Sequence, residues 1–100
     1  MSDLQALEKL EQLGALRLLV LLSEKERYVT ELLRGRTNPE GITSQDSLRM
    51  CRWELGERGL GLIEEHMEKG PRPKTFLVIT EKGRRVAKKI KEIEGILEET

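Results

Sequence analysis

The chain has 100 residues, 18 of them basic and 18 acidic, so its formal net charge is zero; 37% of its residues are apolar and 3% are aromatic. This length fits one domain with a single hydrophobic core and excludes two, while the recurring leucine-rich stretches exclude a disordered chain. The densest apolar run, residues 15–22, contains Arg17 and is too short to cross a membrane. We therefore expect a soluble, cytoplasmic protein.

Cysteine and histidine usage argues against a disulfide or a metal site. Cys51 and His66 are the single residues of their types, which excludes an internal disulfide and a four-ligand zinc site. We expect no structural metal and no cofactor. The acidic residues are 16 Glu and 2 Asp, a bias that favours a thermophilic source.

The zero net charge hides an uneven distribution along the chain. Residues 1–33 carry −2, residues 34–91 carry +6, and residues 92–100 carry −4. A basic centre between acidic ends favours a polyanionic partner for the central segment. Ordinary mixing of surface charges accounts for the same numbers equally well.

Two helices are predicted at the start of the chain. Ser2 is positioned to cap the first, and Gly14 to end it. Its apolar stripe consists of Leu4, Leu7, Leu10 and Leu13. Residues 15–22 are apolar nearly all round, which predicts a buried central helix.

A helix-turn-helix arrangement is predicted next. After a polar turn at residues 23–27, Thr30 caps one or two helical turns in the segment 29–35, and Gly35 ends them. A turn at residues 36–42 and a capping box at residues 43–46 then begin a third helix. We expect this helix to run to about Arg58 with one buried face, formed by Leu48, Cys51 and Leu55.

A β-hairpin and a closing helix complete the chain. Residues 62–67 and 75–79 read as strands on either side of the Pro- and Gly-rich loop 68–74. Thr80 caps a last helix. Its apolar side chains follow the spacing of a heptad seam, at Val86, Ile90, Ile93 and Leu97.

The order of these elements and two short motifs carry a resemblance to a known family. Residues 55–60, L-G-E-R-G-L, resemble the end of the recognition helix in MarR-like prokaryotic and archaeal winged-helix regulators, and residues 79–83, I-T-E-K-G, resemble the start of their last helix. The resemblance implies an α+β, mainly helical winged helix-turn-helix that binds double-stranded DNA and regulates transcription. On this resemblance, residues 1–100 form one domain. It consists of an N-terminal helix (1–14), a winged-helix core (15–80) and a C-terminal dimerisation helix (81–100).

The outward face of the third helix holds the candidate DNA-binding residues. Helical periodicity places Asp46, Arg49, Met50, Trp53 and Glu57 opposite the buried face. Clustered exposed Met and Trp indicate an interface, although they can also cover a neighbouring helix. On the helix-turn-helix template, the residues nearest the base edges are Ser44, Gln45, Ser47 and Arg49. Asp46 can accept a hydrogen bond from a cytosine amino group or cap the helix, and we favour the cap.

The loop between the strands supplies further cations. Lys69, Arg72 and Lys74 lie on a loop stiffened by two prolines, which suits contact with phosphates. A plainly solvated turn is the alternative interpretation. The cations of the last helix straddle it on several sides, so we assign them mainly to solubility.

The other reactive side chains do not indicate an enzyme. Cys51 on the buried face is predicted to be inert core, with a redox sensor as the minor alternative. His66 reads as an exposed strand position, and adjacent Glu64 and Glu65 point to opposite faces of the strand. The sequence contains neither a recognisable catalytic triad nor a phosphate-binding glycine loop.

Two classes of function therefore remain. The first is a sequence-specific DNA-binding regulator, and the second is a protein-interaction module of a larger assembly, anchored by Trp53 and Met50. The basic central segment favours the first and the zero net charge the second. A small-molecule effector is not identifiable from the sequence.

The apolar stripes at the two ends of the chain predict a homodimer. A small domain with a core of its own has little surface left to bury both stripes. A two-fold dimer packed through its terminal helices covers them and presents two recognition helices to DNA. The interface residues would be Leu4, Leu7, Val86, Ile90, Ile93 and Leu97.

Overall fold

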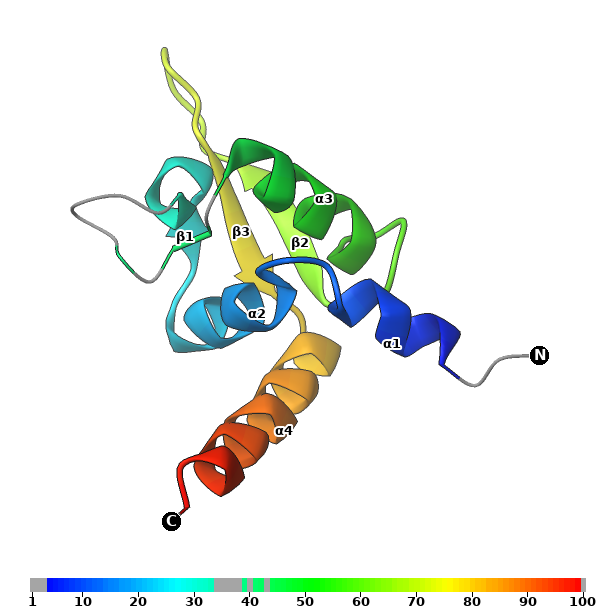
Figure 1. Ribbon diagram of the computed structural model, residues 1–100. Coiled ribbons are helices and arrows are strands. Elements are labelled where there is room, and N and C mark those ends of the chain that lie inside the picture. The colour runs from blue at the N-terminus through cyan, green and yellow to red at the C-terminus, as the bar shows by residue number, and fades with distance from the viewer. Residues whose placement is uncertain (1–3, 34–38, 40, 43, 100) are drawn as a thin grey trace.

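The computed structural model describes residues 4–33, 39, 41–42 and 44–99. Figure 1 shows helices packed around a small sheet from which a long hairpin projects. The helices are α1 (Gln5–Leu10), α2 (Ala15–Glu24), the 3₁₀ helix η1 (Val29–Leu32), α3 (Gln45–Leu55) and α4 (Glu81–Leu97). The strands are β1 (Arg27–Tyr28), β2 (Ile63–Met67) and β3 (Thr75–Ile79). The α+β, mainly helical class is as predicted.

The sheet is antiparallel with strand order β1-β3-β2, so β2 is an edge strand. The predicted hairpin is confirmed, with Ile63 opposite Ile79 and His66 opposite Phe76. The strand β1 was not predicted. Arg27, expected in a polar turn, pairs with Leu77 of β3 instead, because backbone pairing rather than side-chain periodicity defines so short a strand.

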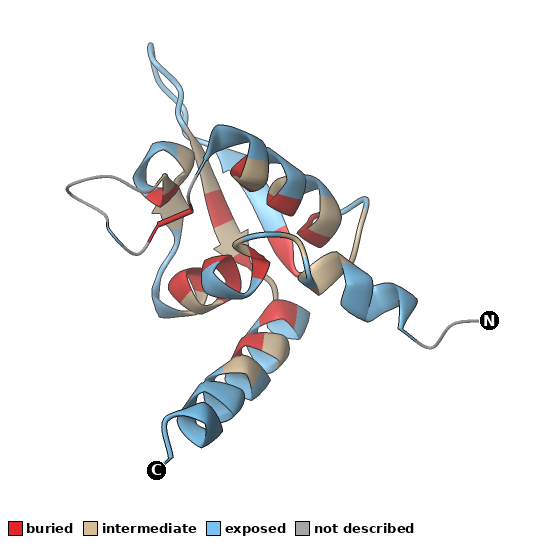
Figure 2. Cartoon of the chain, viewed as in Figure 1, coloured by how far each residue is buried: buried red, intermediate tan, exposed pale blue. Residues whose placement is uncertain are grey.

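The core is built around α2, as predicted. Leu18, Leu19 and Leu22 are fully buried there, together with Leu55 of α3 and Leu77 of β3. Figure 2 shows the buried residues concentrated where α2, α3 and β3 meet, with the far half of α4 exposed. Each such leucine contributes about 1.5–3 kcal/mol through its removal from water.

The cap at Thr80 is as expected, whereas the cap of α3 stands at Ser44, one residue later than the capping box at residues 43–46 predicted, and the assignment of Asp46 is wrong. The Ser44 side chain caps α3 by accepting from the backbone N–H of Ser47 at 3.1 Å, and Thr80 caps α4 by accepting from Gly83 at 3.0 Å. Asp46, which we assigned to the cap, instead lies in the first turn of α3 and pairs with Arg49. The Ser2 cap and the predicted end at Gly35 lie outside the described residues.

The N-terminal helices differ from the predictions in length and type. The first ends at Leu10 rather than Leu13, since it buries no residue that would stabilise another turn. Gly14 instead begins α2, with a φ of +86° and Ile42 Cδ1 only 2.9 Å from where a Cβ would stand. The next helix begins after Tyr28, so Thr30 lies inside η1 and does not cap it.

The third helix also ends earlier than predicted, at Leu55 rather than Arg58. Gly56 and Gly59 fold the chain back against the helix end, where an added Cβ would lie 2.5 Å from the Arg52 carbonyl and 1.9 Å from the Glu54 carbonyl, respectively. The backbone N–H of Leu60 donates to Glu54 and that of Leu62 to Leu55, both within 2.9 Å. The motif at residues 55–60 thus builds the turn that leads into β2.

Candidate nucleic-acid interface

The first turns of α3 bring the predicted base-edge residues together. Gln45 and Arg49 are exposed, and Ser47 is half-buried. The Ser44 hydroxyl, besides capping the helix, donates to Ser47 Oγ at 3.1 Å. Arg49 Nη2 lies 3.2 Å from Asp46 Oδ1, with 74% of the Arg49 side chain exposed. The ion pair orients this guanidinium while leaving most of its donors open to solvent.

Farther along α3, Met50 and Trp53 form an exposed apolar pair. They are 40% and 54% exposed, respectively, which confirms that they face outward. Arg58 lies with its guanidinium carbon 5.1 Å from the centroid of the Trp53 ring, within the range of a cation–π contact. The sequence reasoning missed Arg58, because the glycine turn after α3 is what returns it to the helix face.

A groove of about 920 Å³ separates α3 from the edge strand β2; we call it the α3–β2 groove. Arg52 of α3 and Glu65 of β2 bridge it, with Arg52 Nε donating to Glu65 Oε1 at 3.1 Å. The charged groups lining it are Arg49, Arg52, Arg58, Glu57, Glu64 and Glu65. Because cations and carboxylates balance, the groove floor does not by itself favour a phosphate.

The hairpin loop carries the other predicted contacts. Lys69, Arg72 and Lys74 are all exposed on it, and Figure 1 shows the loop extending well beyond the body. The N–H of Glu68 donates to the Lys74 carbonyl at 2.8 Å, which closes the base of the loop. Gly70 adopts a φ of +144°, a conformation that favours glycine.

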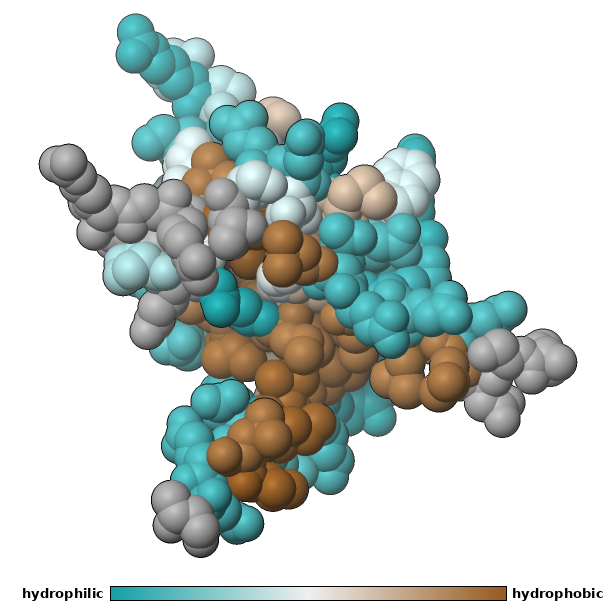
Figure 3. All heavy atoms as spheres, viewed as in Figure 1, coloured by the Kyte–Doolittle hydropathy of each residue, from teal (hydrophilic) through white to brown (hydrophobic). Residues whose placement is uncertain are grey.

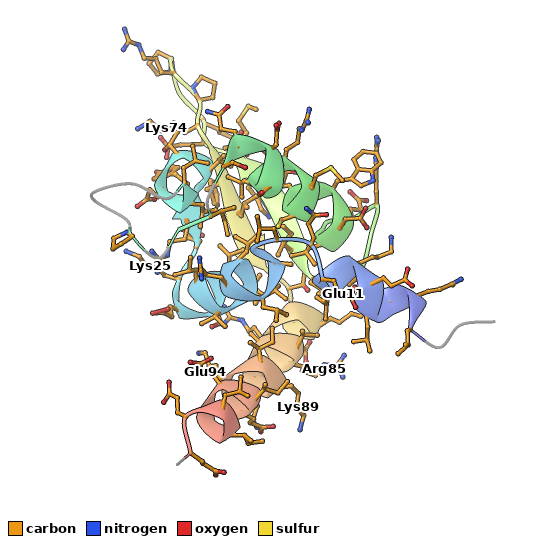
Figure 4. All side chains as sticks on the ribbon, viewed as in Figure 1. Glu11, Lys25, Lys74, Arg85, Lys89 and Glu94 are labelled. Atoms are coloured by element: carbon orange, nitrogen blue, oxygen red, sulfur yellow. The ribbon has the colours of Figure 1, made fainter. Side chains whose placement is uncertain are left out.

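Lys74 lies at the foot of the loop rather than at its tip, as the label in Figure 4 shows. Its ammonium is 5.5 Å from the centroid of the Tyr28 ring. Tyr28 donates a hydrogen bond to Glu68, and that bond together with the Glu68 charge raises the pKa of the Tyr28 hydroxyl. Lys74 is thus partly engaged by its own chain, which leaves Lys69 and Arg72 as the projecting cations.

The outer face of the sheet is formed by aromatic and acidic side chains. His66 stacks on Phe76 with ring centroids 5.6 Å apart, and Tyr28 meets Phe76 edge-on at 6.1 Å. His66 Nε2 is 3.1 Å from Glu64 Oε1, as its predicted exposed strand position allows. Within the described part of the chain, no three His, Cys, Asp or Glu side chains are grouped to hold a metal ion.

Cys51 is a buried part of the core, as predicted. Its Sγ lies 3.2 Å from the Leu13 carbonyl, which links α3 to the connection before α2. Burial raises the pKa of the Cys51 thiol to about 11. The thiolate that oxidants and alkylating reagents attack is therefore strongly disfavoured.

The predicted dimer residues fall into two groups. Leu4, Leu7, Ile93 and Leu97 are 52% to 74% exposed. Val86 and Ile90, in contrast, are half-buried against the core of their own chain. The described helices include none that is long and apolar enough to cross a membrane.

Comparison with known proteins adds one likeness. No model of a protein family and no curated protein matches the sequence. The fold is similar to a solved structure, that of the circadian clock associated protein Pex from anabaena, with a TM-score of 0.66. The likeness covers 83% of this chain and 75% of that one. The fold is a winged helix. At 18% sequence identity the likeness extends to the fold alone, and membership of the MarR-like group stays a prediction.

Proposed function

We propose that this chain is a sequence-specific regulator of transcription that binds double-stranded DNA with α3 in the major groove and the hairpin loop on the phosphate backbone. The observation that carries the proposal is the pairing of an exposed polar helix start with a projecting cationic hairpin. The MarR-like motifs at residues 55–60 and 79–83 and the winged-helix fold support it. On this proposal the protein is not an enzyme and acts in the cytoplasm.

The proposed roles follow from chemistry and exposure. Arg49 pairs with a guanine edge and Gln45 with an adenine edge, since each can make a bidentate hydrogen bond there. Ser44 and Ser47 hold the helix start against the groove wall. Trp53 and Met50 provide the apolar contact at the far end of α3, backed by the Arg58 stack.

The electrostatic attraction to DNA phosphates is assigned mainly to the hairpin loop. The α3–β2 groove is neutral overall, because Glu57, Glu64 and Glu65 offset its three arginines. Lys69 and Arg72, and in part Lys74, therefore supply most of the phosphate contact. Few phosphate contacts give a shallow but measurable dependence of affinity on salt.

A homodimer completes the proposed regulator. In this proposal each chain forms one winged-helix domain, and the terminal helices of residues 1–14 and 81–100 are added to its core. Two copies related by a two-fold axis present their α3 helices to successive major-groove turns, about 34 Å apart. Such a dimer reads a palindromic site.

The test is the affinity for a mixed-sequence duplex, measured by fluorescence anisotropy from low to moderate salt. We expect binding that weakens as salt rises, and a smaller salt slope when Lys69, Arg72 and Lys74 are all replaced by Ala. A matched control replaces Lys25, an exposed cation away from both the DNA-facing surface and α4, with Ala and leaves the slope unchanged. No binding at low salt would contradict the proposal.

A second candidate function is favoured by one observation. Trp53 and Met50 are exposed beside a groove whose charges balance, as in a surface that anchors a protein partner through aromatic side chains. On this alternative the chain is an interaction module of a larger assembly. It predicts that Trp53→Ala abolishes partner capture, while the wild type shows no salt-dependent affinity for DNA.

A further inference from the structure

The helix α4 has opposite charge in its two halves. Residues 81–91 contain six cations and one carboxylate, whereas residues 92–99, the last turns of α4 and the two residues that follow its end, contain four carboxylates and no cation. We call these two segments the basic half and the acidic half. Both halves carry their charges on exposed positions. The charges of such a helix are complementary to those of a second copy when the two helices lie antiparallel.

Among the described residues of α4, those of the acidic half are all exposed. Gly83 and Ala87 are buried in the basic half, where α4 lies against α2, but residues 91–99 are all exposed (Figure 2). The acidic half nevertheless carries Ile93, Ile96 and Leu97, which are 55%, 63% and 74% exposed. Exposed aliphatic side chains grouped in this way mark a surface that another surface covers.

A groove suited to such a segment lies beside the basic half. It has a volume of about 1230 Å³ and runs between α1, the start of α2 and α4; we call it the α1–α4 groove. Its apolar lining is contributed mainly by Leu7, Leu10, Leu13, Leu16, Val86 and Ile90. Figure 3 shows apolar side chains continuing from the exposed end of α4 into the region between α1 and α2.

The edge of the α1–α4 groove is basic. Four cations line it, Arg17, Lys82, Arg85 and Lys89, against one carboxylate, Glu11. In Figure 4, Arg85 and Lys89 extend from one flank of α4, while Glu94 extends from the other. An apolar floor with a basic edge fits an amphipathic helix that carries carboxylates.

We propose that the α1–α4 groove binds the acidic half of α4 from a second copy of this chain, with the two α4 helices antiparallel about a two-fold axis. In this orientation the acidic half of each α4 faces the basic half of the other, and the two antiparallel helix dipoles attract each other. Parallel helices would place like charges together. The contact is self-complementary and closes at two copies, because each chain donates one helix end and one groove. This inference rests on the homodimer of the proposed function and adds its direction and its contact surfaces.

Charge reversals at exposed positions test the direction. The acidic-half variant carries Glu92→Lys, Glu94→Lys and Glu98→Lys, and the basic-half variant carries Arg85→Glu, Lys88→Glu and Lys89→Glu. The third variant combines all six changes. Sedimentation equilibrium without DNA measures the dimer dissociation constant of each, and circular dichroism checks that each stays helical. Because DNA is absent, the result is independent of whether the chain binds it.

We expect a wild-type dimer at micromolar concentration that weakens as salt rises. Each half-variant should dimerise at least about tenfold more weakly, since both symmetric contacts become repulsive, and the six-fold variant should recover close to wild-type affinity. Parallel helices predict a wild-type dimer that strengthens with salt. A monomeric wild type, which would leave the groove to another partner, or half-variants that dimerise as the wild type does would overturn the inference.

Discussion

Arg52 and Glu65 join α3 to the edge strand β2: Arg52 Nε donates to Glu65 Oε1 at 3.1 Å across the α3–β2 groove. The carboxylate holds the guanidinium and also cancels its charge on the proposed DNA-facing surface. A pair that is this exposed contributes little to stability, about 0–1 kcal/mol. Its main consequence is electrostatic.

Glu65→Gln should therefore strengthen DNA binding. The change keeps the side-chain shape, removes one carboxylate and releases Arg52 for a phosphate. We expect the affinity for mixed-sequence duplex DNA at low salt to rise by roughly twofold to fivefold, as one added phosphate contact allows. Glu64→Gln is the matched control, since it removes the same charge without releasing Arg52. Equal effects of the two changes would show that Arg52 is not near the DNA.

Arg49→Ala and Arg72→Ala should affect DNA binding differently. Arg49, on the exposed face of α3, is proposed to read a base, so its loss should cost about 1–3 kcal/mol at the preferred site and less on random DNA. Arg72, on the hairpin loop, should weaken both DNAs alike and reduce the salt slope by about one. Titrations of both variants on both duplexes measure this. If the two variants lost the same affinity on each DNA, the placement of α3 in the major groove would be wrong.

Two glycines of α4 should respond to alanine in opposite ways. At Gly83 an added Cβ would lie 2.2 Å from the Leu62 backbone carbonyl, so Gly83→Ala should cost about 1–3 kcal/mol of stability. At Gly95 nothing lies within 4 Å, and Gly95→Ala should add up to about 1 kcal/mol through helix propensity. Thermal unfolding of both variants at one protein concentration provides the comparison. A stable Gly83→Ala protein would show that α4 does not pack on the turn before β2 as described.

Cys51 should be protected from thiol reagents in the native protein. Burial raises its pKa to about 11, so at pH 8 very little thiolate forms. We expect slow alkylation of the folded chain and rapid alkylation in denaturant, read by mass spectrometry. Fast modification of the folded protein would support the redox-sensor alternative.

The same pKa shift makes a second measurement possible. Burial raises the pKa of the folded thiol from its ordinary value of 9.0 to about 11, so burial of the neutral thiol stabilises the fold fully below pH 9. This contribution is lost as the pH rises from about 9 toward 11. The stability difference between wild type and Cys51→Ala should shrink over that range, and a constant difference would contradict it.

Side-chain periodicity predicted the elements that bury one face. Leu18, Leu22, Leu48 and Leu55 are spaced for helices that face a common core, and all four are buried. Alternating apolar residues and a Pro- and Gly-rich loop located the hairpin. The cap at Thr80 was equally readable, because its chemistry is local.

The missed features depend on contacts between distant residues. The strand β1 exists because Arg27 and Tyr28 pair with β3, some fifty residues later in the chain. The Trp53–Arg58 contact depends on the turn at Gly56 and Gly59, and the neutralisation of Arg52 depends on where β2 lies beside α3. Helical periodicity placed Met50 and Trp53 outward, but it could not show which of the neighbouring cations are already paired.

The most direct test of the DNA-binding account is the perturbation of backbone amide NMR signals when duplex DNA is added at low salt. The account predicts that the largest shifts fall in two segments, residues 44–53 and residues 68–74, with smaller changes in α2. Shifts concentrated in α1 and α4, or no shifts at all, would contradict it.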